Sequence, residues 1–215
     1  MTPPAPVLAA PCVDVLLLAA GRSRRMGAAD KLLLPVGDAG KAQPMVRHAA
    51  QIYADLGLPV TVVTSPENDA VTGALAGLNL TLIANASAKA EQPDSLRTGL
   101  AAMPLAAPGL LIALADQPLL TTADISALID FFCTHPTHIC IPRHAGQRGN
   151  PVILPQAIAR LLRDDSARPT PRAYMDRHPD EIAWFEADHP HFTSDIDTPQ
   201  DAARLLALSP CHPHP

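Results

Sequence analysis

The chain has 215 residues, a formal net charge of −5, 47% hydrophobic residues and 17% charged residues. This length suffices for one globular domain with its own core, and the acidic balance excludes a general nucleic-acid binder, which needs a basic face. No apolar run approaches the 18 residues of a membrane span, and residues 1–11 lack the Lys or Arg of a secretory signal. We therefore expect a cytoplasmic protein with neither a nucleic-acid nor a membrane partner.

The cysteines and histidines predict no metal site. Four cysteines occur without C-x-x-C spacing, which excludes a zinc knuckle or a thioredoxin-type motif, and we expect free thiols. Cys133 and Cys140 lie in apolar sequence and are expected in the core. The two H-P-H stretches, residues 189–191 and 212–214, are interpreted as surface residues.

Strand-like and helix-like segments alternate along the chain. Aliphatic and β-branched runs predict strands at residues 13–18, 60–64, 80–84, 110–115, 139–142 and 182–186. Helical spacing predicts helices at residues 45–57, 95–103 and 124–132, and a last helix that begins at Pro199. Such alternation predicts βαβ units and a mostly parallel sheet, which is the α/β class. Residues 147–151 are expected to form a polar loop, and the Pro-rich ends, 1–11 and 209–215, disordered tails.

The segment 18–31 follows the first predicted strand directly. Small residues at positions 19–21 allow the backbone to approach a ligand closely. Four cations follow within ten residues, namely Arg22, Arg24, Arg25 and Lys31. This pattern predicts a cradle for a polyphosphate at the carboxyl end of a strand. The alternative is a solvated basic turn. The segment contains neither G-x-x-x-x-G-K-S/T nor G-x-G-x-x-G, which counts against a P-loop NTPase and against an NAD-binding fold.

Carboxylates occur where they could hold a divalent cation against such a polyphosphate. Asp116 ends the most apolar predicted strand, and Asp195 and Asp197 lie two positions apart before the last helix. Mg²⁺ typically takes one or two carboxylates together with substrate phosphates. We predict Asp116 and Asp197 as ligands and Asp195 as their support. The alternative for Asp116 and for Asp197 is the capping of a helix or turn.

The stretch 146–151 has two glycines, a guanidinium and an amide in one short loop. This combination suits the recognition of an oxyanion or a heterocycle. The alternative is an ordinary turn.

Taken together, the segments 18–31, 116–118, 149–151 and 195–199 resemble the molybdenum cofactor nucleotidyltransferases, and most closely the cytidylyltransferases of that family. The resemblance covers residues 13–206. It implies a Rossmann-like, three-layer α/β/α fold of the nucleotidyltransferase type. It also implies a single domain over residues 1–208, with a nucleotide-binding N-terminal half and an acceptor-binding C-terminal half.

The resemblance further implies a set of site residues. Nucleotide binding is expected at Leu18, Ala19, Ala20, Gly21, Arg22, Ser23, Arg25, Lys31 and Ser95. Catalytic roles are expected for Arg25, Lys31 and Asp116, and Mg²⁺, or Mn²⁺ in its place, at Asp116 and Asp197. Acceptor binding is expected at Arg148, Gly149, Asn150 and Pro151. Arg143 and His144 flank the polar loop and are further expected contacts to an anionic pterin, while Arg168 and Arg172 are expected to reach a phosphate from the C-terminal half. The alternative for each of these arginines is an ordinary surface position.

The implied reaction transfers CMP from CTP to the terminal phosphate of molybdopterin, giving molybdopterin cytosine dinucleotide and pyrophosphate. A molybdenum hydroxylase would receive the product. Ala20 favours CTP, since guanylyl relatives resemble L-A-G-G there, whereas the spacing up to Lys31 resembles the guanylyl branch. Three alternatives stay open: guanylyl or other nucleotidyl transfer to a phosphorylated acceptor, a nicotinamide-dependent oxidoreductase, and a non-catalytic carrier of the cofactor.

Overall fold

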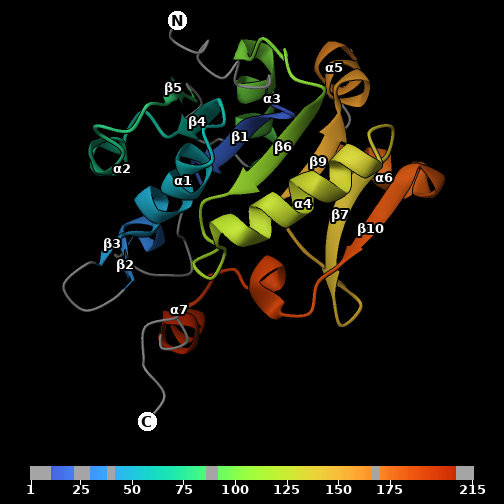
Figure 1. Ribbon diagram of the computed structural model, residues 1–215. Helices are drawn as coiled ribbons and strands as arrows, with labels where there is room; N and C mark the ends of the chain where they lie inside the picture. Colours follow the sequence, from blue (N-terminus) through green and yellow to red (C-terminus); the bar gives the residue numbers. More distant parts are fainter. Residues whose placement is uncertain (1–10, 22–29, 38–41, 86–91, 166–169, 207–215) are drawn as a thin grey trace, which may run out of the picture.

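The computed structural model describes residues 11–21, 30–37, 42–85, 92–165 and 170–206. Within them, one main sheet has eight strands in the order β10-β7-β9-β6-β1-β4-β5, with β8 paired to β7 (Figure 1). These strands are β1 (Val13–Ala19), β4 (Val60–Thr64), β5 (Thr81–Ala84), β6 (Gly109–Leu114), β7 (Ile139–His144), β8 (Gln147–Arg148), β9 (Val152–Pro155) and β10 (Ile182–Glu186). A separate pair is formed by β2 (Pro35–Val36) and β3 (Gln43–Pro44).

The main sheet is mostly parallel, as the alternation of strands and helices predicts. β1 pairs in parallel with β4 on one side and with β6 on the other, and β10 pairs in parallel with β7. Among the longer strands, β9 runs antiparallel between β6 and β7. Because β1 and β6 are neighbours with Leu18 opposite Leu114, their carboxyl ends lie at the same edge of the sheet.

Helices cover both faces of the sheet, so the fold is a Rossmann-like α/β/α sandwich (Figure 1). The α-helices are α1 (Met45–Asp55), α2 (Asp69–Ala74), α3 (Gln92–Ala102), α4 (Thr122–Thr134), α5 (Gln156–Asp164), α6 (Pro171–Arg177) and α7 (Pro199–Leu206). Short 3₁₀ helices occur at η2 (Lys31–Leu33), η3 (Pro179–Glu181) and η4 (Pro190–Thr193). Val15 and Leu17 of β1 join the core under α1 and α4, whereas Leu16 and Leu18 join the core under α3, α5 and α6. This alternation follows from the two-residue period of a strand that is buried on both faces.

Two helix starts near the functional edge are fixed by reciprocal caps. Thr121 caps α4, and its hydroxyl and backbone exchange hydrogen bonds with Asp124. At α7, Thr198 and Asp201 form the same arrangement: the Oγ1 of Thr198 accepts from the Asp201 amide at 3.2 Å, while Asp201 accepts from the Thr198 amide at 2.9 Å. Such a capping box satisfies amides that a helix start leaves unpaired.

Several expectations need correction. The sequence patterns did not predict β9, α2, α5 or α6, which have four, six, nine and seven residues. Residues 147–148 pair with β7 as β8 instead of forming a loop, because Ala145 and Gly146 both adopt positive φ angles and make a tight hairpin turn. Cys133 is exposed at the end of α4, with its Sγ 2.8 Å from that of Cys12, whereas Cys140 is buried. The predicted tails, apart from Pro11, lie outside the described residues. No helix in the described part of the chain is long and apolar enough to cross a membrane.

Candidate active site at the carboxyl edge of the sheet

The carboxyl ends of β1 and β6 form the floor of the candidate site. The Ala115 amide donates to the Leu18 carbonyl at 3.2 Å, which continues the pairing of the two strands up to this edge. The next residues after β1, Ala20 and Gly21, border open space, and a Cβ added to Gly21 would meet no described atom within 4 Å. The backbone after β1 is therefore accessible to a ligand.

Lys31, at the start of η2, contacts both the segment after β6 and the segment before α7. Its Nζ donates to Oδ2 of Asp116 at 2.6 Å, to Oδ1 of Asp197 at 3.0 Å and to the carbonyl of Ile196 at 2.8 Å. Burial acts to lower the pKa of Lys31, but the charges and hydrogen bonds of Asp116 and Asp197 outweigh it, so the pKa lies above its ordinary value. The ammonium group is thus charged and bridges the two carboxylates that the sequence predicts as metal ligands.

The carboxylates of this site have an oxygen that is still available to bind a cation. Oδ1 of Asp116 is buried and has no hydrogen-bond partner among the described residues. The pKa of Asp195 is raised by partial burial and by the neighbouring charges of Asp116 and Asp197. Two carboxylates contact the ammonium group and a third, Asp195, lines the same cavity. Carboxylate oxygens are the ligands that Mg²⁺ and Mn²⁺ prefer. The residues present therefore fit a divalent cation.

The capping alternatives for the two predicted ligands do not hold in the described structure. The cap of α7 is made by Thr198 and Asp201, while the carboxylate of Asp197 contacts Lys31. The nearest helix after Asp116, α4, is capped by Thr121. Both carboxylates are directed to the site.

The C-terminal segment is held against the sheet by backbone contacts around η4. The amide of Ile196 donates to the Asp116 carbonyl at 2.9 Å. The carbonyl of Phe192 accepts from Nε2 of Gln117 at 2.9 Å and from the Asn150 amide at 2.8 Å. A Cβ on Gly149 would lie 2.4 Å from that same carbonyl oxygen. These contacts explain why a long side chain at position 117 and a glycine at position 149 are needed here.

Two cavities lie at this edge. The first, which we term the carboxylate cavity, has a volume of about 280 Å³. Its walls are Leu18, Ala20, Gly21, Lys31, Leu32, Gln92, Ser95, Leu114, Ala115, Asp116, Asp195 and Asp197. The second, the arginine cavity, has a volume of about 370 Å³. Its walls are Leu18, Gln92, Pro93, Leu96, Ile112, Leu114, Arg148, Gly149, Asn150, Val152, Thr170, Pro171, Arg172 and Met175. Leu18, Gln92 and Leu114 line both, so the two cavities adjoin.

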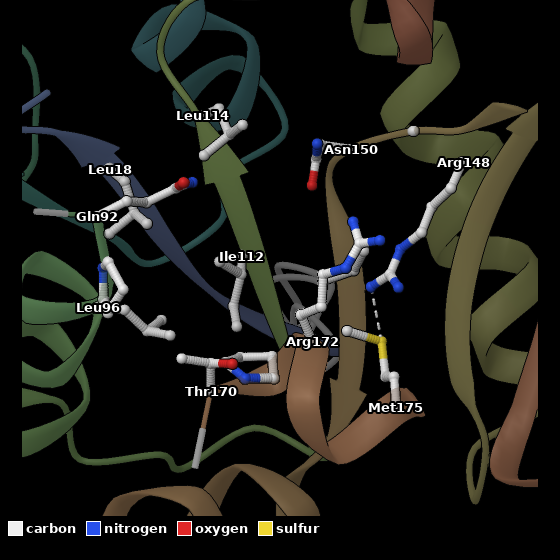
Figure 2. A pocket seen from close by; sticks show the side chains of 14 residues that line it. Leu18, Gln92, Leu96, Ile112, Leu114, Arg148, Asn150, Thr170, Arg172 and Met175 are labelled. Atoms are coloured by element: carbon white, nitrogen blue, oxygen red, sulfur yellow. Dashed lines mark hydrogen bonds between the residues drawn. The ribbon is translucent and has the colours of Figure 1, made fainter. Parts of the chain in front are cut away.

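The arginine cavity has one cationic side and one apolar side. Figure 2 shows the guanidinium groups of Arg148 and Arg172 on one side, with Leu18 and Leu96 across the cavity from them. Nη2 of Arg148 lies 2.9 Å from Sδ of Met175, which is a weak acceptor (Figure 2). The pKa of Arg148 is lowered, first by burial and then by the charge of Arg172, with Asp176 opposing the effect. Two guanidinium groups held this close favour an anionic ligand.

The structure brings most of the predicted residues to these cavities. Ala19 is buried in β1, Pro151 is buried behind the arginine cavity, and neither is a wall residue. Arg22, Ser23, Arg25 and Arg168 lie outside the described residues. Arg143 and His144 point elsewhere, since Arg143 pairs with Glu186 and stacks on Trp184, and His144 contacts the Ala187 carbonyl.

Sequence reasoning missed Thr170 and Met175 as wall residues. Thr170 caps a helix and Met175 has the residue type of a core position, so neither carries a sign of a ligand site. Helices α3 and α6 lie on the same face of the sheet and line one cavity. Their proximity is a tertiary feature that no local pattern predicts.

The fold and site define the class of protein: an α/β nucleotide-binding protein with a carboxylate pair at the edge where such sheets bind ligands. Residues 15–182 match the family described as the MobA-like NTP transferase domain. The chain belongs to this family and is a nucleotidyltransferase by class, which confirms the resemblance inferred from the four motifs.

Similar proteins and similar solved structures cover nearly the whole chain. The chain is 25% identical over 223 residues to the molybdenum cofactor guanylyltransferase of Shewanella loihica, covering 91% of this chain and 96% of the relative. A nucleotidyl transferase from Methanothermobacter thermautotrophicus matches with a TM-score of 0.75 and 19% identity, covering 92% and 97% of the two chains. Rv0371c of Mycobacterium tuberculosis, solved in complex with manganese, matches with a TM-score of 0.64 and 23% identity, covering 91% and 97%.

Proposed function

We propose that the protein transfers a nucleotidyl group, CMP from CTP, to the terminal phosphate of molybdopterin. The observation that carries the proposal is the pair of adjoining cavities: one has carboxylates and accessible backbone, and the other has two guanidinium groups. The first suits a metal-bound nucleoside triphosphate, and the second suits a phosphorylated acceptor. The relative named as a molybdenum cofactor guanylyltransferase supports the acceptor class and makes GTP the main competing donor.

The chemistry needs positioning and charge neutralisation rather than a covalent nucleophile. An oxygen of the acceptor phosphate attacks the α-phosphorus of the nucleotide, the bond from that phosphorus to the β-phosphate oxygen breaks, and pyrophosphate leaves. Asp116 and Asp197 would hold Mg²⁺ or Mn²⁺, which supplies charge neutralisation for the triphosphate. The attacking phosphate is ionised near pH 7, so no general base is required.

The residues divide between the two cavities. Ala20, Gly21, Lys31 and Ser95 would contact the nucleotide, and Lys31 would move from the carboxylates to the phosphates when metal binds. Arg148, Arg172 and Asn150, which all line the arginine cavity, would bind the acceptor. In this arrangement the N-terminal half binds the nucleotide and the C-terminal half binds the acceptor, within one domain. Cytoplasmic location and product delivery to a molybdenum hydroxylase remain predictions.

The deciding experiment measures pyrophosphate release with CTP, GTP, ATP or UTP, each with and without molybdopterin. We expect release with CTP that requires both molybdopterin and Mg²⁺. A GTP preference would keep the transfer and overturn the cytidylyl assignment. Absence of release with all four nucleotides, from a protein that still binds molybdopterin, would overturn the transferase proposal in favour of a carrier. Asp180→Asn, at an exposed position outside both cavities, is the matched control for Asp116→Asn.

A further inference from the structure

Asp124, His189 and His191 form a cluster outside both cavities. Asp124 is buried in the first turn of α4, and the two histidines flank Pro190 at the start of η4. Nε2 of His189 lies 3.1 Å from Oδ1 of Asp124, and Nδ1 of His191 lies 2.9 Å from Oδ2. One ligand atom from each residue can be chosen so that all three lie within 4.8 Å of one another.

We propose that these three residues bind a divalent transition-metal ion of the Zn²⁺ class, at a site separate from the carboxylate cavity. Imidazole nitrogens and a carboxylate oxygen are typical ligands of such ions. Ligand atoms at 2.0–2.1 Å from a tetrahedral metal lie about 3.3 Å apart. The two nitrogen–oxygen separations, 3.1 Å and 2.9 Å, are within a few tenths of an ångström of that value, and all three ligand atoms lie within 4.8 Å of one another. Three protein ligands leave a fourth position for water.

The hydrogen bonds within the cluster leave one of its buried polar atoms without a partner among the described residues. Nδ1 of His189 is buried and has no hydrogen-bond partner in the described part of the chain. The two imidazole rings lie with centroids 3.9 Å apart, and each contacts a different oxygen of the same carboxylate. Both the backbone amide and the hydroxyl of Thr121 donate to Oδ2 of Asp124 at 2.9 Å. These donors orient the carboxylate independently of the histidines, as outer-shell partners of metal ligands do.

The position of the cluster gives the metal a structural role. η4 follows directly from His189, and its Phe192 carbonyl holds Gln117 and the Asn150 amide. A metal that links η4 to α4 would therefore immobilise the segment that carries Asp195 and Asp197 into the carboxylate cavity. The ligand sets differ in kind, because Asp116 and Asp197 offer oxygen alone, whereas the cluster offers two nitrogens. Mg²⁺ prefers the first set and Zn²⁺ the second.

The test uses the whole chain, with Co²⁺ as the probe and excess Mg²⁺ to saturate the oxygen ligands. We expect one Co²⁺ per chain with a visible absorption band, which Zn²⁺ displaces. His189→Ala and His191→Ala should each weaken Co²⁺ binding at least about tenfold. Zn²⁺ should raise the Tm of the wild type and leave the Tm of both variants unchanged. Co²⁺ binding and Tm are measured without any assay of activity, so the result does not depend on the proposed transfer reaction.

Two controls make the outcome decisive. Asp116→Asn removes a carboxylate of the other site. His138→Ala removes one histidine of a second pair, His135 and His138, whose ring centroids lie 6.4 Å apart. Both should keep the Co²⁺ band and the Tm rise. Unchanged Co²⁺ affinity in both His189→Ala and His191→Ala, or a band lost in Asp116→Asn, would overturn the proposal. The side chains of His189 and His191 are 42% and 30% exposed, so their truncation leaves no closed cavity, and far-UV circular dichroism without metal checks the fold.

Discussion

The carboxylate cavity and the arginine cavity share Leu18, Gln92 and Leu114 but carry opposite charge. In the first, the carboxylates have a cationic partner of their own, Lys31. In the second, two guanidinium groups lie close enough for one to lower the pKa of the other. One edge of the sheet thus presents a cation site and an anion site side by side. A metal-bound triphosphate and an anionic acceptor need such a pair of sites to meet.

Asp116→Asn is the change expected to have the largest effect. The amide keeps the shape of the side chain but removes the charge that faces the metal and Lys31. Pyrophosphate release should fall by roughly 10²–10³-fold, the scale of losing one preorganised electrostatic contact. The acceptor should still bind, which calorimetry with molybdopterin measures. An equal loss of acceptor binding would contradict the assignment of nucleotide and acceptor to separate cavities.

Lys31→Met tests whether the ammonium group occupies the position of a metal. Turnover should fall because the phosphates lose a cation. Mn²⁺ affinity without nucleotide should rise roughly tenfold, which corresponds to about 1.4 kcal/mol of relieved competition at Asp116 and Asp197. Titration of Mn²⁺ by electron paramagnetic resonance measures this, and unchanged or weaker Mn²⁺ binding would contradict the competition.

Arg148→Met and Arg172→Met test whether the arginine cavity binds the acceptor. Each should raise the KM for the acceptor by about 10–100-fold, because a charge-assisted bond to an anion contributes about 1.5–3 kcal/mol. The KM for the nucleotide should stay unchanged. Steady-state kinetics with each substrate varied in turn measures both, and a rise in the nucleotide KM alone would exchange the roles of the two cavities.

Gly149→Ala and Gly21→Ala form a matched pair on stability. The new Cβ at position 149 would lie 2.4 Å from the Phe192 carbonyl oxygen, whereas that at position 21 would meet no described atom within 4 Å. Gly149→Ala should lower the free energy of unfolding by about 1–3 kcal/mol, as overpacking does. Gly21→Ala should leave it within about 0.5 kcal/mol. Denaturant titration compares them, and equal midpoints would show that the contact at Gly149 carries no cost.

Ala20→Gly is expected to have the smallest effect. A single methyl group in the loop changes discrimination by about 1–3 kcal/mol at most. The ratio of kcat/KM for CTP to that for GTP should fall without loss of the better rate. An unchanged ratio would remove position 20 from the residues that select the base.

Much of the fold could be predicted from local pattern. The buried run of β1 and the helical spacing of α1 and α4 are strong one-dimensional signals, and the structure has these elements within a few residues of the predicted bounds. By contrast, β9 has four residues and runs against its neighbours, so neither length nor periodicity distinguished it. Cys133 was misplaced because its apolar neighbours suggested a core position, while the turn of the helix directs it outward.

The sequence by itself determined which chemistry is present: a cationic segment after a strand, and carboxylates after another strand and before the last helix. The structure decided how these groups are combined. The backbone contact of Ile196 with Asp116 brings Asp197 and Asp116 to the same Lys31. The pairing of β8 with β7 places Arg148 at the cavity that α6 completes with Arg172. Residues so far apart in the chain share no local pattern, since their contact depends on the packing of the whole sheet. The same holds for Asp124 and the histidine pair: the sequence predicts the start of a helix at Asp124 and a surface stretch at residues 189–191, and tertiary packing joins them.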